Sequence, residues 1–203
     1  MAGGWDDASA SSFGLLGMGS GGVLAQIELV GPHLRVGGKI DIGRFSRLSD
    51  RVNHSRGYIR IQDARLLKRN GDPTPLLVPV LYVNQDEVTF IAMAHLSDEG
   101  APQAGAGSSA DRPLIEKQPR RYLVFTPGHV ISGVAHVYRD MTVEGFADTP
   151  DPRFIPMTEV SARSLADRRV VSHFDLLLVN RTQMTAVAEA APDSAADVPV
   201  VES

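Results

Sequence analysis

Hydrophobic and polar residues alternate along most of this chain in short runs separated by turn residues. Such alternation is typical of β-strands that bury one face. In the first half of the chain it predicts strands over residues 23–30, 34–42, 58–61, 64–68, 76–83 and 88–94. In the second half it predicts strands over residues 122–125, 130–137, 154–157, 160–165, 170–179 and 184–188. The pattern of strands alternating with long helices is absent, so the sequence predicts a mainly all-β fold.

The clearest helical signal is a single turn over residues 46–53. Ser46 can cap this turn, and Leu48 and Val52 stand four residues apart on one face. Residues 141–146, at the corresponding place in the second half, carry a weaker pattern. We therefore expect one short helical turn in an otherwise β-structured chain.

Residues 84–87 are polar and separate two predicted strands. Asn84 tolerates a positive φ, which tight hairpin turns require. We therefore expect the strands at 76–83 and 88–94 to form a hairpin.

One sequence pattern occurs twice, at an offset of 96 residues. Residues 81–92 read Leu-Tyr-Val-Asn, a polar turn and Val-Thr-Phe-Ile-Ala, and residues 177–188 read Leu-Leu-Val-Asn, a polar turn and Met-Thr-Ala-Val-Ala. A one-residue shift further upstream places Gly38 over Gly133. A glycine inside a strand pattern indicates a bend or bulge, which small barrels need in order to curl. We interpret the pattern as a duplicated β-rich unit.

The duplication divides the chain into five parts. They are a flexible arm at 1–22, a first β-domain at 23–96, a linker at 97–118, a second β-domain at 119–189 and a disordered tail at 190–203. Each β-domain is expected to be a small, partly open barrel of the size of SH3-like or Sm-like barrels. Units this short are near the lower limit for a self-sufficient core, so they should pack on each other or self-associate.

The composition is ordinary for a soluble globular protein, with 43% hydrophobic and 22% charged residues among 203. The chain has no cysteine, which excludes disulfides, thiolate catalysis, iron–sulfur clusters and cysteine-type zinc sites. It has no apolar run of the roughly 20 residues that a membrane helix needs. The first residues lack the basic and apolar regions of a signal peptide. These features predict a cytoplasmic protein without a membrane span.

The net charge of −4 conceals an unequal distribution. Residues 24–96 contain ten Lys and Arg and seven acidic residues, whereas residues 119–189 contain eight of each. Binding to a polyanion would therefore have to be local to the first domain.

An arginine cluster in the first domain is the candidate binding face, for a polyanion or an acidic partner. Its residues are Arg44, Arg47, Arg51, Arg56 and Arg60. Arg47 and Arg51 share one face of the helical turn, and aromatic residues stand close to two of the others, as in nucleic-acid binders. The alternative is a solvated face on which Asp50 and Asp63 pair with several arginines, and the residues favour this alternative.

No catalytic or metal-binding motif is present. The six histidines have no zinc-like spacing, and neither a nucleophile motif nor a Walker loop occurs. Asp63 and Glu159 stand at matched positions of the two units, where we favour turn carboxylates over a site between the domains. We therefore predict a protein that is not an enzyme and has no metal and no cofactor.

Three motifs resemble an uncharacterised bacterial family of small β-domains. They are Arg47-Leu48-Ser49-Asp50-Arg51-Val52-Asn53 in the first unit, and Phe154-Ile155-Pro156-Met157-Thr158-Glu159-Val160 and Val179-Asn180-Arg181 in the second. The family patterns are R-L-S-D-x-(L/V)-N, F-(I/L)-P-(L/M)-T-(D/E) and (L/V)-N-(R/K). The second unit lacks the Leu-Ser-Asp motif, so the tandem repeat is degenerate. The resemblance implies a small β-domain in a bacterial protein and no particular activity.

Together these features predict a non-enzymatic binding or scaffolding module. A protein is the favoured partner, and self-association would use exposed strand edges or apolar barrel surface. The alternative is a nucleic-acid-binding protein that uses the arginine-rich face of the first domain.

Overall fold

The computed structural model describes residues 23–68, 71–93, 116–166 and 171–190. The predicted arm, most of the predicted linker and all but the first residue of the predicted tail lie outside these residues. The first half contains β1 (Leu24–Val30), β2 (Arg35–Asp41), α1 (Leu48–His54), β3 (Tyr58–Leu67), β4 (Pro73–Asn84), the 3-10 helix η1 (Gln85–Glu87) and β5 (Phe90–Met93). The second half contains β6 (Lys117–Phe125), β7 (His129–Tyr138), α2 (Val143–Asp148), β8 (Phe154–Ser164), β9 (Val171–Asn180), the 3-10 helix η2 (Arg181–Gln183) and β10 (Ala186–Glu189).

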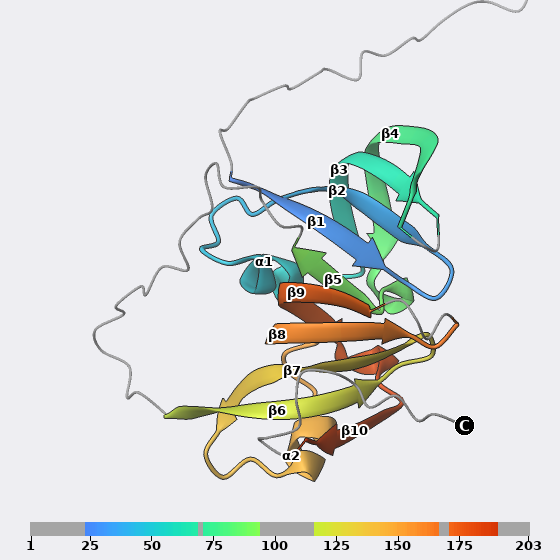
Figure 1. Cartoon of the computed structure of the whole chain (residues 1–203). Helices are drawn as coiled ribbons and strands as arrows, with labels where there is room; N and C mark the ends of the chain where they lie inside the picture. Colours follow the sequence, from blue (N-terminus) through green and yellow to red (C-terminus); the bar gives the residue numbers. More distant parts are fainter. Residues whose placement is uncertain (1–22, 69–70, 94–115, 167–170, 191–203) are drawn as a thin grey trace, which may run out of the picture.

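All ten described strands belong to one antiparallel sheet, in the order β10-β6-β7-β8-β9-β5-β1-β2-β3-β4. Figure 1 shows the first half of the chain at one end of this sheet and the second half at the other. The prediction of a mainly all-β fold is confirmed. The sheet is open, with β4 and β10 at its two edges, so the two predicted barrels are not confirmed.

The same order of elements occurs in both halves: two strands, a short α-helix, two strands, a 3-10 helix and a last strand. Within each half the last strand pairs with the first, β5 with β1 and β10 with β6. The two halves join where β5 also pairs with β9. From β3 onward, residues 96 apart therefore occupy corresponding places in the two halves, whereas before β3 the offset is 95.

The predicted hairpin between residues 76–83 and 88–94 is wrong. β4 pairs with β3, whereas β5 pairs with β1 and β9. Asn84 has a φ of −63° and caps η1, which directs the chain away from β4. The Gln85 side chain holds this turn, because its amide donates to the carbonyls of Val52 and Ser55 at the end of α1 (3.2 Å each).

The prediction of one helical turn is incomplete. α1 lies within the predicted segment except for its last residue, but α2 provides a second helix in the second half. Thr142 caps α2, since its hydroxyl accepts a hydrogen bond from the Gly145 N–H at 3.0 Å. Phe146 is the buried anchor of α2.

The predicted bulges at Gly38 and Gly133 are confirmed. The register between β2 and β3 shifts at Gly38, and that between β7 and β8 shifts at Gly133. Opposite these glycines, Asp63 and Glu159 have positive φ values of 49° and 50°. Their carboxylates form ion pairs: Asp63 with Lys39 on the adjacent strand β2 (3.0 Å), and Glu159 with Arg121 on β6, across β7 (2.8 Å). These pairs agree with a local role for the two carboxylates.

Two apolar clusters form the core, one under each half. Each cluster includes two side chains from the opposite half. Phe154 and Leu178 of the second half pack into the first cluster. Val30 and Phe90 of the first half pack into the second cluster. The joint between the halves is thus an apolar contact as well as a strand pairing.

Candidate binding surface at the open edge of the sheet

The joint between the halves shows how this sheet accepts an additional strand. β5 lies against β9 with Phe90 opposite Val179, Ile91 opposite Leu178 and Ala92 opposite Leu177. Each of these six side chains is at most 3% exposed. Main-chain hydrogen bonds and burial on both faces therefore hold the strands together.

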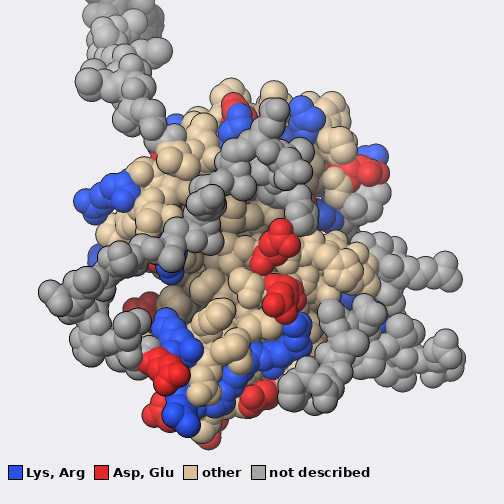
Figure 2. Space-filling view, turned by 60° about the vertical axis from the view of Figure 1, so that its left-hand side comes forward, with Lys and Arg blue, Asp and Glu red and all other residues tan. Residues whose placement is uncertain are grey.

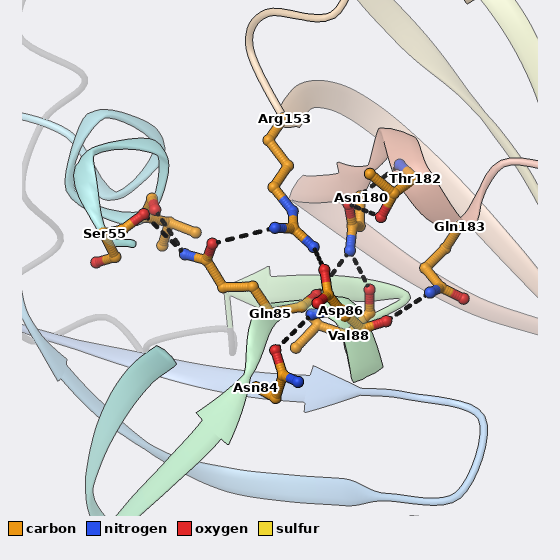
Figure 3. A network of polar contacts seen from close by, with 10 residues as sticks. Ser55, Asn84, Gln85, Asp86, Val88, Arg153, Asn180, Thr182 and Gln183 are labelled. Carbon is orange, nitrogen blue, oxygen red and sulfur yellow. Dashed lines mark hydrogen bonds and ion pairs between the residues drawn. The ribbon is translucent and has the colours of Figure 1, made fainter. Parts of the chain in front are cut away.

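Asn180 is the central polar residue of the joint, and Figure 3 shows its contacts. Its side-chain carbonyl accepts from the Thr182 N–H at 3.2 Å and caps η2. Its amide donates to the carbonyls of Gln85 (2.9 Å) and Val88 (2.6 Å) in the other half. The Asn180 N–H also donates to the Thr89 carbonyl at 2.9 Å. The Thr182 hydroxyl also donates to the Asn180 side-chain carbonyl at 3.0 Å, so this fully buried side chain makes four hydrogen bonds.

Further polar contacts surround the joint. Arg153 forms an ion pair with Asp86 at 2.5 Å, and the Gln183 amide donates to the Asp86 carbonyl (Figure 3). On the α1 side, the Asn53 side chain exchanges two hydrogen bonds with the main chain of Phe154, at 2.7 and 2.9 Å. These contacts fix the register of the joint.

Phe90 is the largest side chain that the first half places in the second. It lies edge-on to His129, with ring centroids 5.1 Å apart, and contacts Phe174 at 6.3 Å. Burial lowers the pKa of His129, and the positive charge of Arg35 lowers it further. The lowered pKa favours the neutral form of His129, and its ring lines part of the apolar pocket that holds Phe90.

On the first half, no strand among the described residues covers the corresponding surface at the edge strand β4. Tyr82 is 61% exposed, whereas Leu178 at the matched position of β9 is fully buried. Tyr58 at the start of β3 is 59% exposed, whereas Phe154 at the matched position of β8 is fully buried. The two tyrosines lie close together at the edge of the sheet, since Tyr58 pairs with Asn84 and Arg60 with Tyr82. We call the exposed surface around them the β4 face. Leu76, Leu77 and Val80, elsewhere on β4, are exposed as well.

A groove of about 340 Å³ lies beside the β4 face. Its lining includes Leu34, Leu66 and Val83. These residues match His129, Ala162 and Val179, which lie next to Phe90 in the second half. The groove therefore stands where a partner's side chain would correspond to Phe90.

Asn84 stands at the end of β4, where Asn180 stands at the end of β9. Its side-chain carbonyl accepts from the Asp86 N–H at 3.0 Å, as that of Asn180 does from Thr182. Its amide has no hydrogen-bond partner among the residues that the structure describes. The polar contact that secures β5 on β9 thus has an unused counterpart on β4.

The predicted arginine face is divided by the structure. Arg44, Arg47, Arg56 and Arg60 are exposed, and the Arg44 guanidinium lies 5.6 Å from the centre of the Phe45 ring. Arg51 is half-buried and is held by the Asp41 carbonyl (3.1 Å) and the Ser55 hydroxyl (2.5 Å). Arg60 lies on β3 opposite Tyr82, and so belongs to the β4 face. On the side shown in Figure 2, Lys and Arg lie in several separate groups.

Comparisons with family models, with curated proteins and with solved structures find no match. The resemblance to the bacterial small-β-domain family therefore stays a prediction. Among the described residues, no group of three His, Asp or Glu side chains could hold a metal ion. No helix in the described parts of the chain has the length and apolar character to cross a membrane.

The β4 face was not predicted as a site from the sequence. Alternation predicted a strand at 76–83 but could not show which strand lies at an edge. The signal that could have found it is the comparison of the two units: Tyr58 and Tyr82 stand where the second unit has Phe154 and Leu178. Tyrosine in place of wholly apolar residues indicates a surface that also contacts water.

Proposed function

We propose that this protein is a non-enzymatic binding and scaffolding module that takes up an extended segment of a partner protein along β4. Strand addition to a sheet edge is a recurrent mode of protein recognition, in which main-chain hydrogen bonds supply affinity and side-chain pockets supply specificity. The observation that carries the proposal is the contrast between β9, which is covered by a strand, and β4, which is not.

Three properties of β4 support this function. The strand leaves a row of apolar side chains in water, which monomeric proteins usually avoid on a strand edge. The groove beside it can receive a partner's side chain. The Asn84 amide can donate to a partner's main chain. Together these supply the apolar, shape and polar parts of a binding site.

We infer that each half is a small, partly open barrel that leaves one strand available. The support is the pairing of first and last strands in each half, the bulges at Gly38 and Gly133, and one apolar cluster for each half. The gap in the first barrel would lie between β4 and β5, where the β4 face begins.

Selection of displayed random peptides tests the proposed function. The purified chain should enrich extended peptides with alternating apolar residues. Tyr82→Glu should abolish this enrichment, because it places a charge at the centre of the β4 face. Tyr138→Glu is the matched control, since Tyr138 is also exposed but lies on the interior strand β7. Equal enrichment on wild type and Tyr82→Glu, or none on wild type, would contradict the proposal.

Nucleic-acid binding is the second candidate function. The observation that favours it is the exposed Arg44 stacked on Phe45, with Arg47 and Arg56 also exposed. Fluorescence anisotropy with mixed single-stranded RNA and DNA at about 50 and 200 mM salt tests it, because phosphate contacts weaken steeply over that range. Binding that is lost at high salt and in Arg44→Ala/Arg47→Ala would establish it. Flat traces at both salt concentrations would exclude it.

A further inference from the structure

We propose that the segment that occupies β4 is strand β10 of a second copy of this chain. This proposal rests on the proposed function and names its partner. The pairing of β5 with β9 in the internal joint supplies the register. β10 matches β5 at positions 96 residues later, and β4 matches β9 at positions 96 residues earlier. The same pairing therefore places Ala186 opposite Val83, Val187 opposite Tyr82 and Ala188 opposite Leu81. β10 and β4 are the two edge strands of the sheet (Figure 1), and no other strand in the described parts of the chain pairs with their outer edges.

The main-chain groups of β4 point the right way. The Asn180 N–H faces β5 and donates to Thr89, and peptide groups alternate along a strand, so the Leu178 N–H faces β5 as well. The matched groups on β4 are those of Asn84 and Tyr82. They face away from β3, toward an incoming strand.

The apolar surfaces that would meet are both incomplete. In the first half, Leu48, Val88 and Ile91 are at most 3% exposed in the cluster that Phe154 and Leu178 complete. At the matched places of the second half, Val143, Met184 and Val187 are only partly buried. Tyr58 and Tyr82 of a second copy stand where they would cover these three residues.

The groove beside β4 has a matched occupant. In the internal joint, Phe90 and its cross-strand neighbour Val30 enter the second half. At the corresponding pair, β10 carries Ala186 and β6 carries Phe125. The aromatic residue of the pair thus lies on the last strand in the first half (Phe90) and on the first strand in the second half (Phe125). An aromatic ring is therefore still available to the groove.

Charge is complementary across the proposed contact. α1 contacts β8 in the internal joint, so α2 would lie against the start of β3 of the second copy. α2 exposes Glu144 and Asp148, whereas Arg56 and Arg60 stand exposed on either side of Tyr58. The predicted acidic partner of these arginines would thus be the α2 helix of another copy.

The contact lacks some features of the internal joint and should be reversible. The Arg153–Asp86 ion pair of the internal joint has no counterpart, because Thr182 occupies the position that matches Asp86 and Gly57 the position that matches Arg153. The two surfaces also differ from each other, which makes the contact head-to-tail. Repetition of such a contact gives a closed ring or an open fibre.

Single-cysteine cross-linking tests the register, because the chain has no cysteine of its own. Leu81 and Ala188 would form a pair whose Cα separation suits a disulfide. Under mild oxidation, a mixture of Leu81→Cys and Ala188→Cys should give a covalent dimer containing both variants. Leu77→Cys, exposed on the same strand, mixed with Ala188→Cys should give none.

Two results would overturn the proposal. One is a Leu81→Cys/Ala188→Cys mixture that cross-links no more than the Leu77→Cys control. The other is a Leu81→Cys sample that cross-links with itself as readily as with Ala188→Cys, which would indicate a symmetric β4–β4 contact.

Sedimentation velocity provides a second measurement that does not depend on Leu81. Wild type and Tyr138→Glu should self-associate, whereas Tyr82→Glu and Ala186→Glu should each be monomeric. A mixture of these two monomeric variants should form a one-to-one dimer, because the intact β4 of Ala186→Glu can still pair with the intact β10 of Tyr82→Glu. This dimer marks the head-to-tail contact. Its absence, or a monomeric wild type, would overturn the proposal.

The outcomes for the two proposals are distinguishable. If peptides bind wild type and not Tyr82→Glu while the chain neither cross-links nor self-associates, β4 binds another protein and the assignment of a second copy fails alone. If peptide binding also fails, the proposed function fails with it.

Discussion

Asn84 and Asn180 occupy the same place in the two halves, yet only Asn180 uses its amide. Both side-chain carbonyls accept from the N–H two residues further on and cap a 3-10 helix. The Asn180 amide is buried against two carbonyls across the joint, whereas the Asn84 amide has no hydrogen-bond partner among the described residues. The same capping structure is therefore bonded to a neighbouring strand system at Asn180 but not at Asn84.

Asn180→Ala should lower the free energy of unfolding by about 2 kcal/mol, because it leaves the Gln85 and Val88 carbonyls buried without a donor. Asn84→Ala should cost about 0.5 kcal/mol, since it removes only an exposed cap. Urea unfolding at a protein concentration where the chain is monomeric measures both. Equal losses would contradict the assignment of Asn180 to the joint.

Gly38→Ala should destabilise more than Gly133→Ala. A Cβ at Gly38 would lie 2.5 Å from Ile61 Cγ2 and 2.9 Å from the Gln62 carbonyl oxygen, which is main chain and cannot rotate away. At Gly133 the nearest atom, at 2.9 Å, belongs to the Val160 side chain. We expect losses of about 3 and 1 kcal/mol in urea unfolding. Gly128→Ala, where a Cβ meets nothing within 4 Å, is the control and should change little.

The stability of the chain should fall as the pH drops below the ordinary histidine pKa of 6.5. Burial holds the pKa of folded His129 below that value, so the unfolded chain binds more protons and protonation favours unfolding. The loss begins near pH 6.5 and continues until the folded pKa is passed.

Thermal unfolding at about pH 7.5 and 5.5 measures this effect. His129→Gln should show a smaller decrease between the two values than wild type. His136→Gln, a change at an exposed histidine, should decrease as wild type does. An unchanged decrease in His129→Gln would show that another group is responsible.

Self-association should weaken with salt and respond to charge reversal. Arg56→Glu/Arg60→Glu should reduce association, because it places negative charge against Glu144 and Asp148. Glu144→Lys/Asp148→Lys should reduce it as well, and a mixture of the two double variants should recover it. Sedimentation velocity at about 50 and 200 mM salt reports each case. A mixture no more associated than its components would place α2 away from β3.

The sequence predicted much of the fold because alternation and glycine position are local signals. Gly38 and Gly133 interrupt their strands where the sheet shifts register, as expected. The turn at residues 84–87 was misread, because a polar segment after Asn84 is compatible with a hairpin or a 3-10 helix. What decides is the Gln85 side chain, which bonds to α1 more than 30 residues earlier in the chain.

The candidate site was less accessible to sequence reasoning. The arginines are identifiable from spacing, but their separation into exposed Arg44, Arg47, Arg56 and Arg60 and internally bonded Arg51 depends on folding. Edge position is likewise a property of strand order. Residues 76–83 differ from residues 172–179 at single positions, such as Tyr82 in place of Leu178, and the alternation that predicts a strand does not register these differences.

The exchange of side chains at the joint makes the two halves one cooperative unit. Phe154 and Leu178 complete the first cluster, and Val30 and Phe90 complete the second, so separating the halves would open both clusters to water. Heat or denaturant should therefore unfold the described sheet in a single transition, although it is built from two similar halves.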